Sequence, residues 1–339
     1  MLKSKNFKFF NKNQLKKIIC IGFGKQIIDV KKFCINNLIK FEWYTGSRQF
    51  NNSNKYEIKK KEELKKLRIY PKIVKNLNNL TNPQDETLVI SIGSPFIIDK
   101  KFIKKFFGKV INHHASPLPE LRGGGEFSWV ILSNSKKGAI TFHLIDKGVD
   151  TGPIFFQKKF TFPKLLRYPL DYQDFTYNKF KNSINLVLNK INSGKSFKLN
   201  YQNHALSSYF PRLNTDLQGY IDWSWKGEEI ERFILAFSYP YNGASTFVQK
   251  RLIRIYNCIF FKKKKFQHSF NYGLVFKYFK NHFFVICLGG YLKITISDIK
   301  SIKKIKLGDK LYTPHHKIQK ASETRIRYNF KGLIKKKSR

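Results

Sequence analysis

An amide, an imidazole and a carboxylate occur together in two turn-rich stretches of this 339-residue chain. The first stretch, INHHASPLPELRGGG at residues 111–125, contains Asn112 and His114. The second, DKGVDTGPI at residues 146–154, contains Asp150. Both stretches are rich in Pro and Gly, which end regular elements and leave polar groups at the edge of a fold. We therefore expect the three side chains to meet at one such edge.

These side-chain types suit the transfer of an acyl group onto an amine. Asn112 can donate its amide to a carbonyl oxygen that becomes negative. His114 can accept a proton from the attacking amine, and Asp150 can orient the imidazole and stabilise its charged form. On an extended segment Asn112 and His114 point to the same side, whereas His113 points away. No Ser or Cys stands in a GxSxG or comparable setting, so we expect direct transfer without a covalent enzyme intermediate.

The residues around this trio are suited to present it to a ligand. The prolines of SPLP at 116–119 lack an N–H donor, so the chain must leave the sheet there. The RGGG run at 122–125 allows close backbone approach and opens a helix whose first turn can take an anion or a polar group. A second tight loop at 148–153 holds Asp150 between glycines.

Short apolar runs alternate with helical patterns in the first half of the chain, which indicates a parallel sheet covered by helices. The expected elements are strands at 17–23, 41–45, 87–91 and 109–111, and helices at 27–38, at 57–67 and after the N-cap Asp99. Ligands of such sheets collect outside the carboxyl ends of strands, where Gly93 and Asn112 stand. GFGK at 22–25 lacks the third glycine of a dinucleotide fingerprint, so we interpret it as a tight turn.

The pattern changes after Gly138 and predicts a second unit. The expected elements are strands at 139–145 and 154–162, a helix at 172–191, a linker at 198–216, a helix at 227–237 and short strands over 245–311. His143 lies on an alternating strand and is interpreted as a packed strand residue. The run of short strands predicts a small barrel or sandwich.

The charge of the chain has two explanations. A formal net charge of +43 and a pI near 10.1 would attract a polyanion such as nucleic acid. Lysine is nevertheless spread over nearly every segment, beside abundant Asn, Ile, Phe and Tyr, the set that A/T-rich codons specify. We favour the compositional explanation and keep a polyanion partner as the alternative.

Length and cysteine usage narrow the class of protein. The chain is long enough for two domains that each bury a core. Its four cysteines stand far apart, with no CxxC and no His at metal-ligand spacing, which predicts a reducing cytoplasm and no metal. The apolar run at 283–296 is too short to span a bilayer, and the N-terminal apolar run is too short for a signal peptide.

At these residues the sequence resembles the folate-dependent formyltransferase family. The family pattern of Asn-x-His, Ser-Leu-Leu-Pro, Arg-Gly and Asp-Thr-Gly stands here as Asn112-His113-His114, Ser116-Pro117-Leu118-Pro119, Arg122-Gly123 and Asp150-Thr151-Gly152, with Pro117 in place of the commoner Leu. The resemblance implies catalytic roles for Asn112, His114 and Asp150. It also implies 10-formyltetrahydrofolate as the formyl donor.

The resemblance further implies which residues surround the ligands. The pterin of the folate would lie between two loops, and the acceptor would meet the loop that follows His114. The implied folate-binding residues are Ile92, Gly93, Ser94, Pro95, Phe96, Leu144, Ile145, Asp146 and Gly148. The implied substrate-binding residues are Ser116, Leu118, Pro119, Arg122 and Gly123.

The resemblance reaches the second unit of the chain. GYIDW at 219–223 and AFSYPYNGA at 236–244 are similar to the motifs that open the C-terminal domain of the tRNA and nucleotide-sugar members. The implied α/β fold is a Rossmann-like, mostly parallel sheet domain followed by a smaller, OB-like β-barrel domain. The expected divisions are a basic tail at 1–16, a catalytic domain at 17–197, a linker at 198–216, a barrel domain at 217–318 and a basic tail at 319–339.

The formylated amine is the part of the function that the sequence leaves open. The tRNA members carry Pro-Asp-Arg-Pro-Ala-Gly-Arg-Gly where this chain has TGSRQFNN at 45–52, and Gly124-Gly125-Glu126 replaces their usual Ala-Ala-Pro. We therefore rank a nucleotide-linked amino sugar first and initiator methionyl-tRNA second. A catalytically silent RNA-binding relative is the alternative from another class, and a homodimer is a further possibility.

Overall fold

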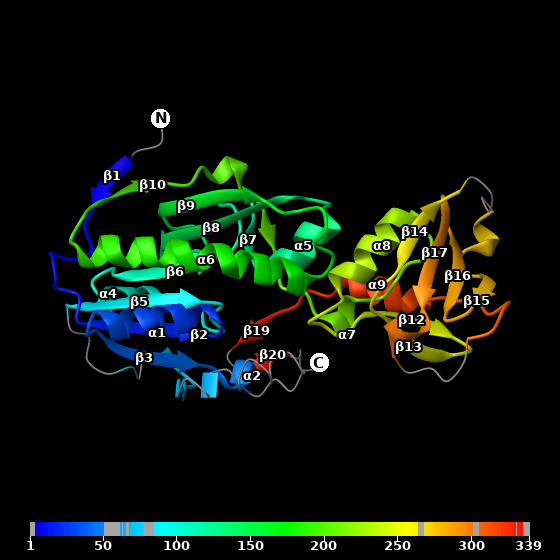
Figure 1. Cartoon of the computed structure of the whole chain (residues 1–339), viewed down its shortest axis with the longest axis horizontal. Coiled ribbons are helices and arrows are strands. Elements are labelled where there is room, and N and C mark those ends of the chain that lie inside the picture. Colours follow the sequence, from blue (N-terminus) through cyan, green and yellow to red (C-terminus); the bar gives the residue numbers. More distant parts are fainter. Residues whose placement is uncertain are drawn as a thin grey trace.

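The computed structural model describes residues 4–50, 62, 64–65, 68–77, 80, 85–263, 268–300, 305–329 and 331–334. Most of the helix expected at 57–67 and residues 51–52 of the TGSRQFNN stretch lie outside the described residues. The molecule is elongated, with a large sheet domain beside a smaller β-rich domain (Figure 1).

Nine strands form the large sheet in the order β1-β10-β9-β8-β6-β5-β2-β3-β4. Their bounds are β1 Ser4–Phe7, β2 Lys17–Gly22, β3 Lys40–Thr45, β4 Lys72–Ile73, β5 Thr87–Ile92, β6 Val110–His114, β8 Lys137–Leu144, β9 Ile154–Thr161 and β10 Phe197–Asn200. The strands β4, β3, β2, β5 and β6 are parallel. The others continue the sheet as antiparallel neighbours, starting with the β6 to β8 pair.

Helices cover both faces of this sheet, as its continuous apolar strands require. The helices of the large domain are α1 Gln26–Asn36, α2 Ser47–Phe50, α4 Lys100–Lys105, α5 Glu126–Leu132 and α6 Pro169–Asn192. The apolar sides of α1 and α6 share one core, and α4 packs into a separate core on the opposite face (Figure 1). Asp99 caps α4 as expected, because its carboxylate accepts the N–H of Phe102 at 2.8 Å. The α/β class is confirmed.

The named strands of the small domain pair antiparallel. Its elements are α7 Thr215–Gln218, α8 Gly227–Ala236, β12 Ala244–Val248, β13 Arg251–Ile255, β14 Ile259–Lys262, β15 Val275–Phe279, β16 His282–Cys287, β17 Gly290–Thr295 and β18 Ile299–Lys300, with short 3-10 turns at Ser269–Asn271 and Ile296–Asp298. Bridges from Tyr312 to Phe247 and from Lys310 to Leu274 join its two sheets into one. The joined sheet encloses one apolar core.

That core also joins the two domains. Val130 and Ile131 of α5 belong to the same apolar cluster as Ile230 and Phe233 of α8. The Ser128 hydroxyl, in α5, donates to the Ala236 carbonyl at 2.8 Å. Because the cluster is buried and continuous, it fixes the small domain against α5, the helix that follows the RGGG run.

Three segments expected as tails or linker are built into the fold. Strand β1 pairs with β10, and Phe9 and Phe10 are buried. Burial of their apolar surface away from water lowers the free energy of the fold. In the expected linker, a 3-10 turn spans His204–Leu206 and β11 Tyr209–Phe210 pairs with β7 Arg122–Gly123. Within the expected basic tail at 319–339, the described residues include the end of a helix and two short strands.

The end of the described chain returns to the large domain. After α9 His315–Glu323, the strands β19 Tyr328–Asn329 and β20 Gly332–Leu333 lie beside α2 (Figure 1). The Arg48 guanidinium of α2 stacks over the Tyr328 ring at 4.9 Å, which places the two segments in contact. A stretch that looked like a solvated basic tail thus packs against the sheet domain.

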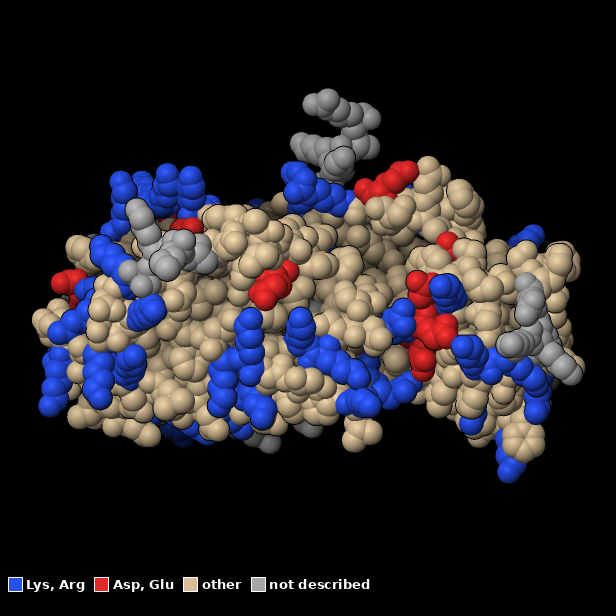
Figure 2. Space-filling model, turned by 90° about the horizontal axis from the view of Figure 1, so that it is seen from above, with Lys and Arg blue, Asp and Glu red and all other residues tan. Residues whose placement is uncertain are grey.

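The surface is basic over both domains. Lys and Arg side chains are spread along the face shown in Figure 2, whereas Asp and Glu gather at a few places. This distribution agrees with lysine that is present in nearly every segment of the sequence. Among the described residues, no helix is both long and apolar enough to cross a membrane.

Candidate active site

A cavity of about 410 Å³ lies at the carboxyl ends of β5 and β6. Asn112, His114, His143 and Asp150 line it, together with residues from the two loops at 93–98 and 145–150. We call this space the site cavity. Its position is the one expected for ligands of a parallel sheet, and it brings the predicted amide, imidazole and carboxylate together.

Strand pairing places Asn112 beside His143, and the loop between β8 and β9 adds Asp150. Asn112 and His143 are direct partners in the β6 to β8 register. The His143 Nδ1 to Leu144 carbonyl distance is 2.8 Å, and since a carbonyl only accepts, Nδ1 carries the proton. In the neutral ring, Nε2 then accepts from Asn112 Nδ2 at 3.1 Å, while the same amide donates to Asp150 Oδ1 at 3.2 Å.

The tautomer of His114 follows from its neighbours in the same way. Its Nε2 lies 2.6 Å from the Leu121 carbonyl and 2.7 Å from Ser116 Oγ. Because the carbonyl only accepts, Nε2 carries the proton of the neutral ring, and Nδ1 holds the lone pair. That Nδ1 lies 3.8 Å from Asp150 Oδ2, so an incoming proton would sit beside a carboxylate.

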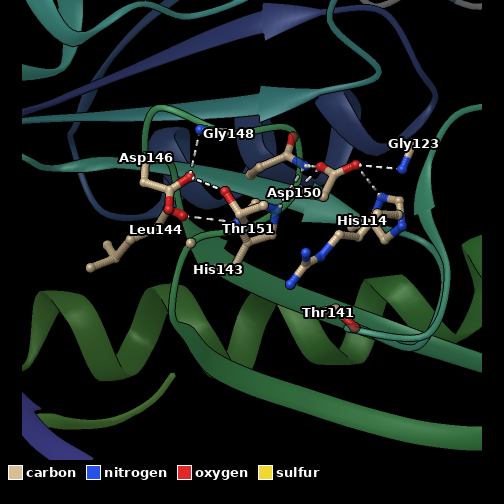
Figure 3. Close-up of polar contacts among 12 residues, drawn as sticks. His114, Gly123, Thr141, His143, Leu144, Asp146, Gly148, Asp150 and Thr151 are labelled. Atoms are coloured by element: carbon tan, nitrogen blue, oxygen red, sulfur yellow. Dashed lines mark hydrogen bonds and ion pairs between the residues drawn. The ribbon is translucent and has the colours of Figure 1, made fainter. Parts of the chain in front are cut away.

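Asp150 is held as an anion by its surroundings (Figure 3). Burial alone would raise the pKa of Asp150, but the positive charges that His114 and His143 carry when protonated, together with the Gly123 N–H, hold that pKa well below its usual range. The Gly123 N–H donates to Oδ2 at 2.9 Å. Asp150 has φ of 54°, a left-handed conformation that Asp adopts more readily than most residues.

His113 points to the other face of the sheet, as the alternation of an extended segment predicts. Its ring contacts Phe142 and Phe180, with centroid distances of 5.3 and 4.6 Å. Burial, with smaller contributions from His114 and His143, lowers the pKa of His113 to about 3. The ring is therefore neutral near pH 7 and belongs to the core.

The predicted folate-binding residues divide into two groups. Those that line the site cavity are Gly93, Ser94, Pro95, Phe96, Ile145 and Gly148. Ile92, Leu144 and Asp146 stand behind them and shape the loops. The Asp146 carboxylate accepts the Gly148 N–H at 3.1 Å and the Thr151 hydroxyl, which closes the loop on itself (Figure 3).

Most of the predicted substrate-binding residues support the site instead of lining it. Of the five, Gly123 lines the site cavity, whereas Ser116, Leu118, Pro119 and Arg122 line neither described cavity. Ser116 is buried against His114, and the Leu118 carbonyl accepts from Gln157 at 3.1 Å. Arg122 is buried and bonded to Gln202, so its guanidinium is occupied.

Gln202 supports the site, and no sequence pattern marks it. Its Nε2 donates to the carbonyls of Asp150 and Gly152 at 2.9 and 2.7 Å, and its Oε1 accepts from Arg122 Nη2 at 2.7 Å. One amide thus ties the Asp150 loop to the RGGG segment. It stands in the expected linker without any surrounding pattern. The interpretation of His143 as packed was right about its burial and missed its contact with Asn112.

Comparisons with known proteins identify the family of this chain. The family described as formyl transferase matches residues 45–163, and its C-terminal domain matches residues 215–311. The methionyl-tRNA formyltransferase of Dictyoglomus thermophilum is 30% identical over 251 residues, 71% of this chain and 69% of that protein. The GDP-perosamine N-formyltransferase of Brucella melitensis is 26% identical over 163 residues, 46% of this chain and 58% of that protein.

A solved structure shares the fold. The N-formyltransferase of Helicobacter canadensis, in complex with folinic acid and dTDP-3-aminofucose, matches with a TM-score of 0.58 at 19% identity, over 83% of this chain and 98% of that one. The two matched family models define a two-domain enzyme of the group-transferring class. The chain belongs to the formyltransferase family, and the expected family and activity class are confirmed.

Proposed function

We propose that this protein transfers the formyl group of 10-formyltetrahydrofolate to a primary amine. The observation that carries the proposal is the meeting of Asn112, His114 and Asp150 in one cavity of a formyltransferase-family chain. We further propose that the protein works in a reducing cytoplasm, since its four cysteines are free and buried. The large domain would hold both reacting groups, with the small domain beside them.

The residues of the site cavity fit a folate. The volume of about 410 Å³ falls within the range of roughly 300–1,000 Å³ usual for small-molecule sites. Phe96, Ile98 and Ile145 supply apolar surface for a flat ring, and the loop backbone at 93–95 supplies polar groups. The folate would bring the formyl group; everything else in the reaction falls to side chains of this protein.

Asn112 would polarise the formyl oxygen. Its two N–H bonds point to His143 and Asp150, and substrate binding would exchange one of them for a bond to the formyl oxygen. A donor aimed at an oxygen that becomes negative is worth on the order of 10²-fold or more in rate. His143 and Asp150 would then hold the amide in position.

His114 would hold the proton that the amine must lose. As the amine nitrogen bonds to the formyl carbon, its proton passes to Nδ1, the nitrogen that faces Asp150 at 3.8 Å. The Asp150 carboxylate stabilises the resulting imidazolium. The same proton is then available to the nitrogen of the folate from which the formyl carbon departs.

For the acceptor we now place initiator methionyl-tRNA first. The Dictyoglomus thermophilum relative is a methionyl-tRNA formyltransferase that aligns over 71% of this chain. We give this overall match more weight than the altered residues at 45–52 and 124–126. The net charge of +43 also suits a polyanionic acceptor, because bound phosphates release condensed counterions.

A nucleotide-linked amino sugar is the second candidate. The Brucella melitensis relative acts on such a sugar by its name, and its alignment covers 46% of this chain. The altered residues Gly124 and Gly125, beside the site cavity, favour a different acceptor from that of the tRNA members.

Formyl transfer measured with both acceptors tests these proposals. The purified chain would be given radiolabelled 10-formyltetrahydrofolate with methionyl initiator tRNA, or with a panel of nucleotide-linked amino sugars. We expect label on the methionyl group, and loss of that label with Asn112→Ala. Label on the sugars alone would reverse our order of acceptors. Tight tRNA binding with no transfer to any amine would identify a silent RNA-binding relative and refute the catalytic proposal.

A further inference from the structure

Four arginine side chains line the site cavity together with Asn112. Arg48 belongs to α2, Arg212 follows β11, and Arg325 and Arg327 stand between α9 and β19. Three segments that are far apart in the sequence therefore bring positive charge to one space. Two of these arginines come from the stretch that the sequence suggested to be a basic tail.

No carboxylate balances these charges in the part of the chain that the structure describes. There, the arginines that pair with acidic side chains are Arg167, 3.5 Å from Glu231, and Arg254, 2.7 Å from Asp216. The acidic residue among those described as lining the site cavity is Asp150, which is already held by two histidines and a backbone N–H. The four guanidinium groups thus face the cavity without a counter-charge from the described chain.

Arg48 shows the electrostatic consequence. Burial and the nearby Arg212 guanidinium lower the pKa of Arg48 to about 10, although Tyr328 acts in the opposite direction. Arg48 stays protonated at neutral pH, so the fold holds two like charges close together in a partly buried place. Such an arrangement is unfavourable by itself and becomes favourable when an anion enters between the charges.

Local structure positions each arginine. The stem of Arg212 lies across Gly124, where a Cβ would overlap its Cγ. This contact gives a physical reason for glycine at a position where the tRNA members usually have alanine. Arg48 is held over the Tyr328 ring at 4.9 Å, and the Tyr328 hydroxyl accepts from Asn214 Nδ2 at 2.9 Å.

The C-terminal segment at 324–328 is anchored so that its arginines face outward from it. Ile326 is 7% exposed, and the Thr324 carbonyl accepts from Gln218 at 3.1 Å. Ile326 and Tyr328 fasten the segment and also line the site cavity, while Arg325 and Arg327 stay exposed. Both of these exposed arginines line the site cavity.

A second cavity meets the first at Arg48 and Arg212. It measures about 460 Å³, lies at the joint of the two domains, and is lined by Ser128, Thr215 and Phe237. Arg48 and Arg212 line both cavities. A formyl transfer needs the folate and the acceptor side by side. Arg48 and Arg212 lie where an acceptor that fills the second cavity would reach the site cavity.

We propose that Arg48, Arg212, Arg325 and Arg327 form a subsite that binds a phosphate group of the formyl acceptor. The planar guanidinium forks match phosphate oxygens two at a time, which lysine cannot do. Both acceptors under consideration carry phosphate groups. This subsite therefore rests on the proposed function, which names those acceptors. The competing anion is the glutamate carboxylate of the folate, and the experiment separates the two.

The test compares the double variant Arg325→Gln/Arg327→Gln with the native chain. Formyl transfer is measured while the acceptor and 10-formyltetrahydrofolate are varied in turn. We expect the KM for the acceptor to rise about tenfold or more, since each lost charge-assisted bond to a phosphate is worth about that much. The KM for the folate and kcat at saturation should change less than about threefold.

Two further variants make the comparison specific. Arg325→Lys/Arg327→Lys keeps the charge without the fork, so it should restore part of the acceptor affinity. Arg251→Gln removes an exposed arginine of β13 that lines neither described cavity, and it should leave both KM values unchanged. Arg48→Gln and Arg212→Gln should each raise the KM for the acceptor as well.

A direct binding measurement keeps this proposal separate from the proposed function. Calorimetric titration with inorganic pyrophosphate, at constant ionic strength, needs no turnover, and the double variant should bind at least about tenfold more weakly. A raised KM for the folate with an unchanged KM for the acceptor would assign the arginines to the folate and overturn the subsite. Unchanged pyrophosphate affinity would overturn it too. Should the double variant unfold, the single variants Arg325→Gln and Arg327→Gln carry the same test.

Discussion

Replacing Asp150 by Asn tests the role of the carboxylate beside His114. Oδ2 lies 3.8 Å from Nδ1, and the two side chains are 11% and 4% exposed, so solvent screens the pair weakly. A unit charge pair at this distance is worth ~4 kcal/mol at an effective dielectric constant of about 20. The proton is only partly transferred in the transition state, so we expect kcat/KM to fall by about 10²- to 10³-fold.

The substitution is chosen to leave the backbone alone. Asn adopts the left-handed φ of 54° as readily as Asp, and its oxygen can still accept the Gly123 N–H. Asp146→Asn, in the same loop, is the matched control. Its oxygen keeps the bonds to Gly148 and Thr151 and faces no catalytic histidine, so a change within a few-fold is expected.

The assay is the pH dependence of kcat/KM for formyl transfer, with thermal unfolding as the check on folding. Without the neighbouring negative charge, His114 gives up its proton more easily, so the acidic limb of the profile should move to lower pH. A variant that melts like the native chain and keeps more than about a tenth of its kcat/KM would refute the charge-stabilisation argument.

Three more predictions follow from the same geometry. Asn112→Ala should lower kcat by on the order of 10²-fold with little change in the KM for either substrate; a pure KM effect would assign Asn112 to binding alone. Gly123 has φ of 100°, and in Gly123→Ala the added Cβ would overlap the Phe210 carbonyl oxygen, so the β7 to β11 pairing should break and both Tm and activity should fall. The control Gly108→Ala, with φ of 74° and open space around the added Cβ, should lower the free energy of unfolding by only about 1 kcal/mol. The pKa of His113 is about 3 in the fold and about 6.5 in the unfolded chain. The neutral ring therefore stabilises the fold fully above pH 6.5, and the free energy of unfolding falls by at most about 1.4 kcal/mol per pH unit as the pH drops from 6.5 toward 3. His113→Phe should therefore lose less stability than the native chain between pH 7 and pH 4 in urea unfolding, and parallel losses would contradict the buried neutral ring.

The three side chains that we propose as catalytic and the parallel part of the sheet could be predicted because local pattern decides them. Buried parallel strands such as 87–92 show as continuous apolar runs, and the alternation of an extended segment separates His114 from His113. The asparagine, histidine and aspartate were recognisable from their spacing to prolines and glycines. The contact of Ser116 with His114 was not predicted, because it depends on how the loop folds back on the strand.

Residues whose role depends on partners far away in the sequence show no local pattern. Gln202 ties two loops together from a stretch without periodicity, and Tyr209–Phe210 becomes a strand only because Arg122–Gly123 offers it a partner. The composition of the C-terminal end is basic, and a basic composition fits a solvated tail as well as a packed segment. Its return to α2 depends on the anchoring of Ile326 and Tyr328, which no local pattern encodes.

The sequence by itself determined the family, the α/β class and the three side chains proposed to carry the chemistry, because these are written in short motifs and in hydrophobic periodicity. Tertiary structure decided which nitrogen of His114 faces Asp150, since that depends on the Leu121 carbonyl on the far side of the ring. It also decided that four arginines from three separate segments share one cavity. Electrostatic interactions act through space and not along the chain, so charges that look scattered in the sequence became a single site only after folding.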